Sequence, residues 1–215
     1  MCQNNGIGYK GGIPWNIQED LQYFSKLTKG KMPPANNAVI MGSHTWKSLP
    51  QGGMGLKGRD NLVLSQASQQ FDFYVRGDYL IKTFPSVEAV ERFITHSVKY
   101  DEVWVIGGAQ VYEQFLSTNK IKKCYITYID RAFECDTFFP ALDMSQWTEV
   151  ERRRDYNATY ACAVDYVVYE KKAYWKILLQ RHLFVRLRKN KFQKLSFTLG
   201  HLGHFVFNAL GPHNH

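Results

Sequence analysis

The segment Val103-Trp-Val-Ile-Gly-Gly-Ala-Gln-Val-Tyr112 decides the fold class of this 215-residue chain. A short apolar run, typical of a buried strand, ends in Gly107 and Gly108, and a helical pattern follows at once. Glycines let a phosphate approach the backbone, and a helix start offers free N–H groups and a partial positive charge. As a bare pattern, however, paired glycines can also simply make a tight strand-to-helix turn.

The rest of residues 1–172 repeats this alternation of apolar runs and short helical patterns, which predicts an α/β domain. Ser86 is the expected N-cap of the middle helix. The expected strands are 38–41, 61–64, 73–75, 79–82, 103–106, 123–129 and 161–169, and the expected helices are about 17–27, 86–96 and 109–116.

A second junction of the same kind is Ile40-Met-Gly-Ser-His-Thr-Trp46. Two helix starts suited to phosphate in one small domain suggest a dinucleotide lying across the carboxyl edge of the sheet. The run Gly6-Ile-Gly-Tyr-Lys-Gly11 matches the G-x-G-x-x-G fingerprint by letter. We reject a Rossmann interpretation of it, because only five residues precede Gly6 and Pro14 blocks the long helix that the fingerprint requires.

The segment Gly11-Gly-Ile-Pro-Trp-Asn-Ile-Gln-Glu-Asp-Leu-Gln-Tyr-Phe24 places an acid on the apolar side of a helix. Asp20 and Phe24 are four residues apart and therefore share a face. A carboxylate there costs free energy unless something binds it, which suggests a pocket for a flat ring that donates hydrogen bonds. An ordinary first-turn acid, favoured by the helix dipole, is the alternative.

Two further side chains are candidates for binding. Arg59 precedes a strand and could hold a carboxylate with two hydrogen bonds, although a solvated loop arginine is the simpler interpretation. Thr127 lies in an otherwise apolar strand and could hydrogen-bond a buried carboxylate, or could be there for its β-propensity alone.

Composition narrows the class of protein. A hydrophobic content of 45% and an aromatic content of 15% are those of a globular chain. No apolar run approaches membrane-spanning length, and the polar start shows no signal peptide. The four cysteines form no C-x-x-C pair, so we expect thiols in a reducing, cytoplasmic compartment and no metal site.

Charge divides the chain into two parts. Residues 173–215 hold seven Lys and Arg and no acid, whereas the residues before them hold 20 basic and 19 acidic side chains. Such a tail could bind nucleic acid or an anionic surface in a salt-dependent way. Because basic ends are common, we do not expect specific nucleic-acid binding.

Taken in order, these segments resemble the dihydrofolate reductases. The matching pieces are Gly6-Ile-Gly8, Pro14-Trp15, Asp20, Phe24, Thr127 and the runs at 39–46, 56–61, 64–65, 106–112 and 136–140. The resemblance implies a central mixed, mostly parallel twisted sheet flanked by helices. It implies one domain over residues 1–172, followed by a basic C-terminal extension, 173–215, of unknown role.

The resemblance also implies an activity. Such an enzyme reduces 7,8-dihydrofolate to 5,6,7,8-tetrahydrofolate in one-carbon metabolism, with hydride passing from NADPH to pterin C6 and a proton reaching N5. The implied ligands are dihydrofolate, folate and NADPH, and we expect a monomer. Ser43 and Gln66 stand where relatives carry basic residues near the 2′-phosphate, which favours a smaller preference for NADPH over NADH.

Site residues follow from the resemblance position by position. The implied catalytic residues are Asp20, Trp15, Thr127 and Tyr112. The implied substrate-binding residues are Ile13, Asp20, Phe24, Leu49, Leu56, Arg59 and Thr127. The implied cofactor-binding residues are Gly8, Ile13, Gly42, His44, Thr45, Leu64, Ser65, Ile106, Gly107, Gly108 and Tyr112, with Asp136 bracing the glycine-rich loop.

One departure from the family concerns the first strand. Relatives begin with a central apolar strand that enters the Gly6 loop, and this chain opens at Met1-Cys-Gln-Asn-Asn. Either the sequence starts downstream of the true start, or the protein lacks most of that strand. A catalytically impaired, ligand-binding relative is the alternative function. The tail run 204–210 is the remaining apolar segment of suitable length. We expect it not to fill the gap, because it does not mimic the route into the Gly6 loop.

Overall fold

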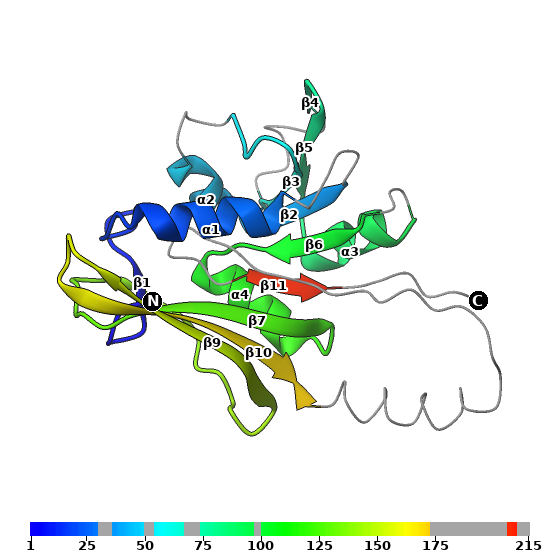
Figure 1. The fold of residues 1–215 in the computed structure, drawn as a ribbon. Helices are drawn as coiled ribbons and strands as arrows, with labels where there is room; N and C mark the ends of the chain where they lie inside the picture. The colour runs from blue at the N-terminus through cyan, green and yellow to red at the C-terminus, as the bar shows by residue number, and fades with distance from the viewer. Residues whose placement is uncertain (30–35, 50–53, 67–73, 97–99, 173–205, 210–215) are drawn as a thin grey trace, which may run out of the picture.

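A computed structural model of the chain describes residues 1–29, 36–49, 54–66, 74–96, 100–172 and 206–209 (Figure 1). The helices are α1 (Gln18–Thr28), α2 (Ser43–Ser48), α3 (Val87–His96) and α4 (Ala109–Ser117). The strands of the large sheet are β2 (Asn37–Gly42), β3 (Asp60–Leu64), β4 (Tyr74–Arg76), β5 (Tyr79–Phe84), β6 (Glu102–Val105), β7 (Ile121–Ile129), β9 (Trp147–Asn157), β10 (Cys162–Lys171) and β11 (Val206–Ala209). The strands β1 (Gly6–Gly8) and β8 (Thr137–Phe138) form a separate pair.

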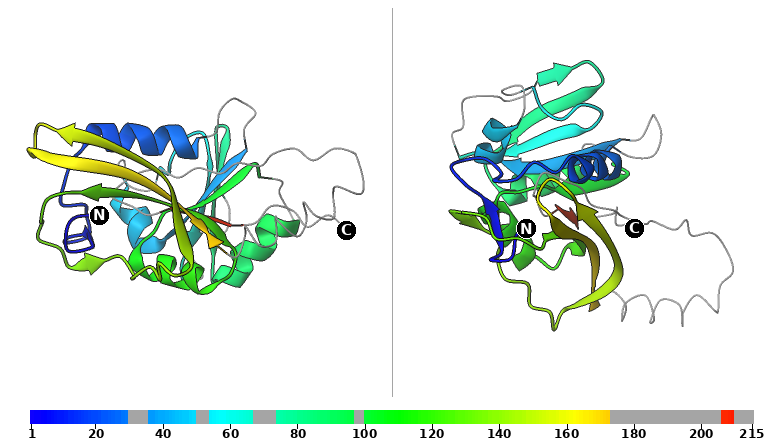
Figure 2. Two further views of the ribbon diagram at one scale, coloured as in Figure 1. Left: turned by 60° about the horizontal axis from the view of Figure 1, so that its bottom comes forward. Right: turned by 60° about the vertical axis from the view of Figure 1, so that its left-hand side comes forward.

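Alternating side chains give the large sheet two packed faces. Ala38 and Ile40 of β2 pack with the apolar side chains of α3 and α4, whereas Val39 and Met41 pack with Phe24 and the α2 region. Successive residues of a strand point to opposite sides, so an uninterrupted apolar run serves both layers. Figure 2 shows the result, with α1 on one side of the sheet and α3 and α4 on the other.

The α/β class and most of the expected elements are confirmed. Every expected strand and helix within the described residues is present, with ends that shift by a few residues. The Ser86 hydroxyl accepts the backbone N–H of Ala89 at 3.2 Å, as expected of an N-cap. None of the helices within the described ranges combines the length and the apolar character that crossing a membrane requires.

The expectation of a mostly parallel sheet is wrong. The strand order is β4-β5-β3-β2-β6-β11-β7-β10-β9, and the parallel pairings are β3 with β5, β2 with β3 and β2 with β6. The remaining neighbours in this order are antiparallel. Antiparallel pairing dominates one half because a β9–β10 hairpin ends the sheet and β11 runs against both of its neighbours.

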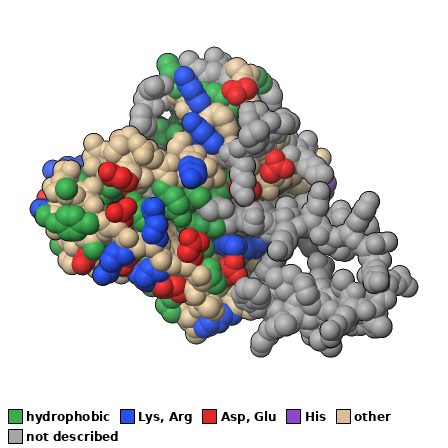
Figure 3. Space-filling view, in the orientation of Figure 1, with side chains coloured by type: hydrophobic (Ala, Val, Ile, Leu, Met, Phe, Trp, Pro, Cys, Tyr) green, Lys and Arg blue, Asp and Glu red, His purple; other side chains and the backbone are tan. Residues whose placement is uncertain are grey.

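The strand β9 was absent from the expected elements. All its residues between Trp147 and Asn157 are exposed, so its sequence lacks the apolar alternation that predicts a strand. Ion pairs with β10 hold β9 in the sheet instead. Arg152 and Arg154 both contact Asp165 of β10, at 2.7 and 2.6 Å. Charged side chains also protect a sheet edge from pairing with other chains, and Figure 3 shows basic and acidic groups interspersed over this region.

The expectation that the tail run would not enter the sheet is also wrong. β11 lies between β6 and β7, where Phe207 pairs with Val105 on one side and with Cys124 on the other. Buried backbone groups of two strands that face each other across a gap must find partners, and this segment supplies them. Apart from β11, the proposed extension 173–215 lies outside the described residues.

Removing one backbone donor from β11 tests its place in the sheet. Proline at a central strand position deletes a ladder hydrogen bond. We expect Phe207→Pro to lower the free energy of unfolding by about 1–3 kcal/mol, the range for a buried group left unsatisfied. Chemical denaturation measures it, with Thr198→Pro, outside the described residues, as the control for proline in the tail. Equal stability of Phe207→Pro and the parent chain would contradict this pairing.

Candidate functional site

One face of α1 organises the candidate site. Its buried residues are Asp20, Phe24 and Thr28, each four residues from the next. Asp20 is only 2% exposed and Phe24 3%. The sequence-based expectation of a carboxylate on the apolar face of this helix is thereby confirmed. Asp20 also lies in the first turn of α1, so the favourable effect of the helix dipole applies to it as well.

Arg59 lies at the far end of the same face. Its guanidinium donates to the Thr28 hydroxyl and to the Lys57 carbonyl, and its central carbon lies 5.4 Å from the centre of the Phe24 ring. The side chain is 5% exposed, and burial lowers its pKa to about 10. None of the ion pairs among the described residues includes Arg59. Arg59 is therefore a buried cation, and the solvated-loop interpretation is wrong.

Two positioning residues of this region were missed in the sequence. Thr28 receives the Arg59 donor and gives its own proton to the Phe24 carbonyl at 3.0 Å. The fully buried Asn61 side chain bonds both the N–H and the carbonyl of Leu56, at 2.8 and 3.0 Å, and the Arg59 carbonyl at 2.8 Å. Helical spacing from Asp20 and Phe24 could have identified Thr28. The sequence contains no comparable spacing that would have identified Asn61 as a positioning residue.

The charge of Asp20 affects its neighbours. Burial raises the pKa of Tyr166, and the Asp20 charge raises it further. Burial lowers the pKa of the Met1 amino group to about 6, while the attraction of Asp20 opposes that shift. The Met1 amino group donates to the Thr127 carbonyl, and Thr127 pairs with Tyr166. Asp20 therefore lies in the region where α1 covers β7 and β10.

Trp15 lies in this apolar region as well. It is 6% exposed, and its ring centre is 5.3 Å from that of Phe133. The indole N–H is buried and has no acceptor among the described residues. Because a buried donor of this kind usually finds a partner, the position suits an ordered water or a ligand.

The two glycine junctions meet at one edge of the sheet. The Gly42 N–H donates to the Gly107 carbonyl at 2.7 Å, and a Cβ added to Gly108 would lie 3.3 Å from the Thr45 hydroxyl. Gly42 and Gly108 are the N-caps of α2 and α4, and as glycines they carry no side chain to cap the first N–H groups. Gly107 has φ +111°, and a Cβ there would lie 2.9 Å from the Tyr112 hydroxyl.

The two parts of the site share one apolar cluster. Phe24 and Leu49 from the α1 side pack with Ile106 from the glycine junction, and Leu56 is partly buried against them. Ile13 packs instead in the cluster that holds Trp15. The remaining predicted residues lie at strand ends or loops. Gly8 is the last residue of β1, and Leu64 is the last residue of β3. Ser65 follows Leu64, and its N–H donates to the Phe84 carbonyl. His44 is exposed on α2.

The Asp136 carboxylate accepts the Lys10 N–H at 2.7 Å, and its own N–H donates to Gly8. It therefore contacts the glycine-rich loop as expected.

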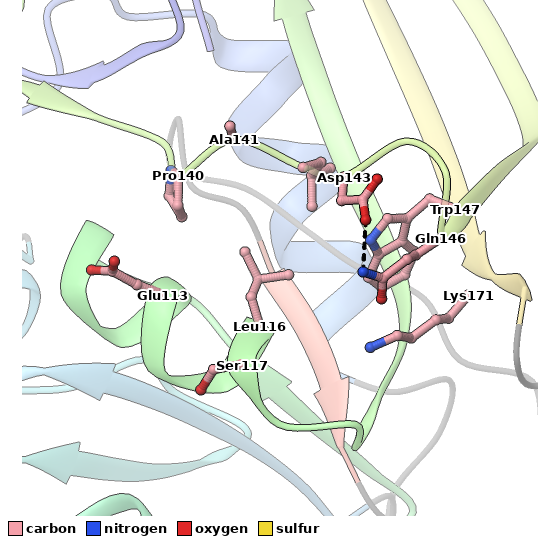
Figure 4. Close-up of a pocket in the computed structure, with 10 residues that line it drawn as sticks. Glu113, Leu116, Ser117, Pro140, Ala141, Asp143, Gln146, Trp147 and Lys171 are labelled. Carbon is pink, nitrogen blue, oxygen red and sulfur yellow. Dashed lines mark hydrogen bonds between the residues drawn. The ribbon is translucent and has the colours of Figure 1, made fainter.

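A cavity of about 360 Å³ lies apart from these residues, between α4, the 140–147 segment and the end of β10 (Figure 4). Several of its polar side chains already form hydrogen bonds within the protein. Asp143 accepts hydrogen bonds from Ser145 and Gln146, and the Lys171 ammonium donates to Asn119. None of the predicted site residues is among its described lining, so we do not assign the candidate site there.

Comparison with known proteins is consistent with this geometry. The dihydrofolate reductase family model matches residues 1–171. The chain is 37% identical to the dihydrofolate reductase of Drosophila melanogaster over 143 residues, which cover 66% of this chain and 76% of that protein. It is 33% identical to the Heliothis virescens dihydrofolate reductase over 154 residues, covering 71% and 82%.

A viral dihydrofolate reductase of Saimiriine herpesvirus 2 is 36% identical over 151 residues, which cover 67% of this chain and 68% of that protein. Together with the family match over most of the chain, these identities establish the relationship. The chain belongs to the dihydrofolate reductase family, whose reaction is the NADPH-dependent reduction of dihydrofolate to tetrahydrofolate.

Proposed function

We propose that the two ends of α1's buried face bind the two ends of dihydrofolate, with Asp20 at the pterin and Arg59 at the glutamate. The observation that carries this proposal is that one helix face joins a buried acid to a buried cation through Phe24 and Thr28. A ligand with a donor-rich ring, an apolar middle and a carboxylate matches that order of side chains.

At the pterin end, Asp20 accepts hydrogen bonds from the amino group and a ring nitrogen. Hydrogen bonds from the pterin to the Asp20 carboxylate favour the protonated ring, so binding and protonation of the pterin are coupled. Trp15 and Thr127 position the water through which a proton reaches N5. Ile13 and Tyr112 flank the pterin, and Phe24, Leu49 and Leu56 enclose the aminobenzoyl group.

At the glutamate end, Arg59 holds the α-carboxylate. A pKa of about 10 leaves the guanidinium charged at neutral pH. Thr28 and the Lys57 carbonyl fix its orientation, which lets the remaining donors form a planar pair of bonds to a carboxylate.

The glycine junctions fit NADPH, which supplies the hydride when bound. Gly42, Gly107 and Gly108 leave space next to the backbone that a side chain would fill, and the Gly42 N–H itself donates to the Gly107 carbonyl. We assign the phosphates to these glycines together with Thr45, and the adenosine side to His44, Leu64 and Ser65. Ile106, Tyr112, Ile13 and Gly8 complete the nicotinamide side.

Oxidation of NADPH in the presence of dihydrofolate, followed by absorbance, tests the proposed function of the full chain. Substrate-dependent turnover supports it. A chain that binds NADPH and folate without turnover would contradict it and favour a ligand-binding relative.

Asp20 is the first residue to change. Asp20→Asn keeps the shape and removes the charge that favours the protonated pterin. We expect hydride transfer at pH 7 to fall by about 10²-fold or more, the usual scale for a lost proton-transfer group. Much of the loss should return at low pH, where solvent protonates the substrate directly. Glu19→Gln, an exposed acid on the same helix, is the matched control. Wild-type turnover of Asp20→Asn at pH 7 would remove Asp20 from the mechanism.

Arg59→Gln tests the carboxylate end. Each hydrogen bond to a charged group contributes about 1.5–3 kcal/mol, so KM for dihydrofolate should rise by about 10- to 100-fold. A dihydropterin that lacks the glutamate serves as the control substrate, and its kcat/KM should not change. If both substrates lose kcat/KM equally, Arg59 supports the fold and does not bind the carboxylate.

Gly107→Ala tests the cofactor cradle. Its Cβ would meet the Tyr112 hydroxyl in a backbone conformation that side chains rarely adopt. We expect Kd for NADPH, measured by fluorescence titration, to rise at least about tenfold, an increase of 1.4 kcal/mol in binding free energy. Gly77→Ala is the control, because Gly77 also has positive φ but has open space around it. Unchanged NADPH affinity in Gly107→Ala would exclude this junction from the cofactor site.

We further propose a monomer in the cytoplasm, without specific nucleic-acid binding. The four free cysteines support a reducing compartment. Light scattering coupled to size exclusion measures the oligomeric state, and a dimer mass would contradict the monomer.

A further inference from the structure

Two thiols far apart in the sequence meet beside the glycine-rich loop. The Sγ atoms of Cys2 and Cys135 are 3.7 Å apart. Cys2 is buried at 2% exposure, whereas Cys135 is partly exposed. The two sulfurs lie beside Gly6, where an added Cβ would come within 2.2 Å of the Cys135 sulfur. A disulfide requires a sulfur separation of ~2.05 Å, so closure needs a relative shift of under about 2 Å.

These cysteines lie on two segments that already hold each other. We call residues 1–10 and 130–139 together the clasp. Hydrogen bonds cross it at both ends, from the Gln3 N–H to the Arg131 carbonyl at 3.2 Å and from the Phe139 N–H to the Asn5 carbonyl at 2.9 Å. The Tyr9 hydroxyl also donates to Glu134 at 2.6 Å. The backbone around both thiols is thus fixed by contacts other than the sulfur contact itself.

The clasp also reaches the proposed active site. Phe133, two residues before Cys135, packs on Trp15, and the carboxylate of Asp136, the next residue, accepts the Lys10 N–H. The adjoining turn at Gly11, which has φ +77°, is closed by hydrogen bonds between Tyr9 and Gly12 at 2.9 and 3.0 Å. A bond across the clasp would therefore restrict the loop that leads to Trp15.

We propose that Cys2 and Cys135 are a modification site, where a small-molecule disulfide of the glutathione type forms a reversible intramolecular disulfide that locks the clasp. The thiolate of the more exposed Cys135 attacks one sulfur of the small disulfide, forms a mixed disulfide and releases one small thiol. The Cys2 thiolate then attacks the Cys135 sulfur and releases the second. Two protein thiols are oxidised, one small disulfide is reduced to two thiols, and the two protein protons end on those thiols.

The reaction is slow at neutral pH. Burial, the hydrogen bond with Cys2 and the nearby charge of Asp136 raise the pKa of Cys135 to about 11, so the attacking thiolate is a minor species. The pair therefore stays reduced where small thiols are abundant and closes only under sustained oxidation.

Chemical mapping of the intact 215-residue chain tests the bond without reference to the proposed reaction. After incubation with oxidised glutathione at pH 8, we expect the titratable thiols to fall from four to two. The mass should drop by about 2 Da, and a peptide should link Cys2 to Cys135. Cys2→Ser and Cys135→Ser should each abolish the loss of mass, whereas the matched controls Cys124→Ser and Cys162→Ser should retain it. Four remaining thiols, a persistent glutathione adduct or a link to Cys162 in the parent chain would overturn the proposal.

Turnover of the oxidised chain tests whether the Cys2–Cys135 disulfide affects the proposed active site. We expect kcat to fall at least twofold on oxidation and to recover with dithiothreitol, while Cys135→Ser is unaffected by oxidant. A Cys2–Cys135 disulfide that leaves kcat unchanged would overturn the coupling to the site, although the modification itself would stand. Because mapping needs no turnover, an inactive chain would contradict the proposed function without affecting the test of the bond.

Discussion

The need to pair the facing edges of β6 and β7 is the constraint on which the rest of the structure depends. The two strands face each other across the width of one strand, and their buried N–H and C=O groups need partners. Two remote parts of the chain provide them. The Met1 amino group and carbonyl bond Thr127 and Ile129 of β7, and β11 pairs with β7 from Tyr125 to Ile121. Met1 and the tail strand thus follow one another along the same edge of β7.

The candidate site depends on the same pairing, because its two halves are attached to β6 and β7. β6 leads directly into Ile106, Gly107 and Gly108, and β7 carries Thr127. A tail segment more than 70 residues beyond Thr127 therefore supports the glycine junction and the Thr127 region of β7 together. A change in β11 would alter activity through the sheet without touching a ligand.

Local patterns predicted what depends on local geometry. The buried Asp20 and Phe24 follow from helical spacing, and the glycine junctions follow from strand–glycine–helix order. β9 could not be predicted, because its stability comes from Asp165 contacts with Arg152 and Arg154 across a hairpin rather than from apolar alternation. β11 could not be predicted either. Its insertion depends on which distant backbone groups lack partners, and this is a property of the assembled sheet that no window of sequence contains.

In the proposed function, the distance between the buried acid on α1 and the buried cation held at the end of the same helix sets the length of the ligand. Asp20 and Thr28 are eight residues apart, or about 12 Å along the helix axis, and Arg59 is held at Thr28. At that separation in protein the mutual attraction of the two charges is weak. Under this proposal, a ligand with donors at one end and a carboxylate at the other contacts both charges at once. A shorter molecule would reach only one of them, so the spacing along α1 would discriminate between ligands by length.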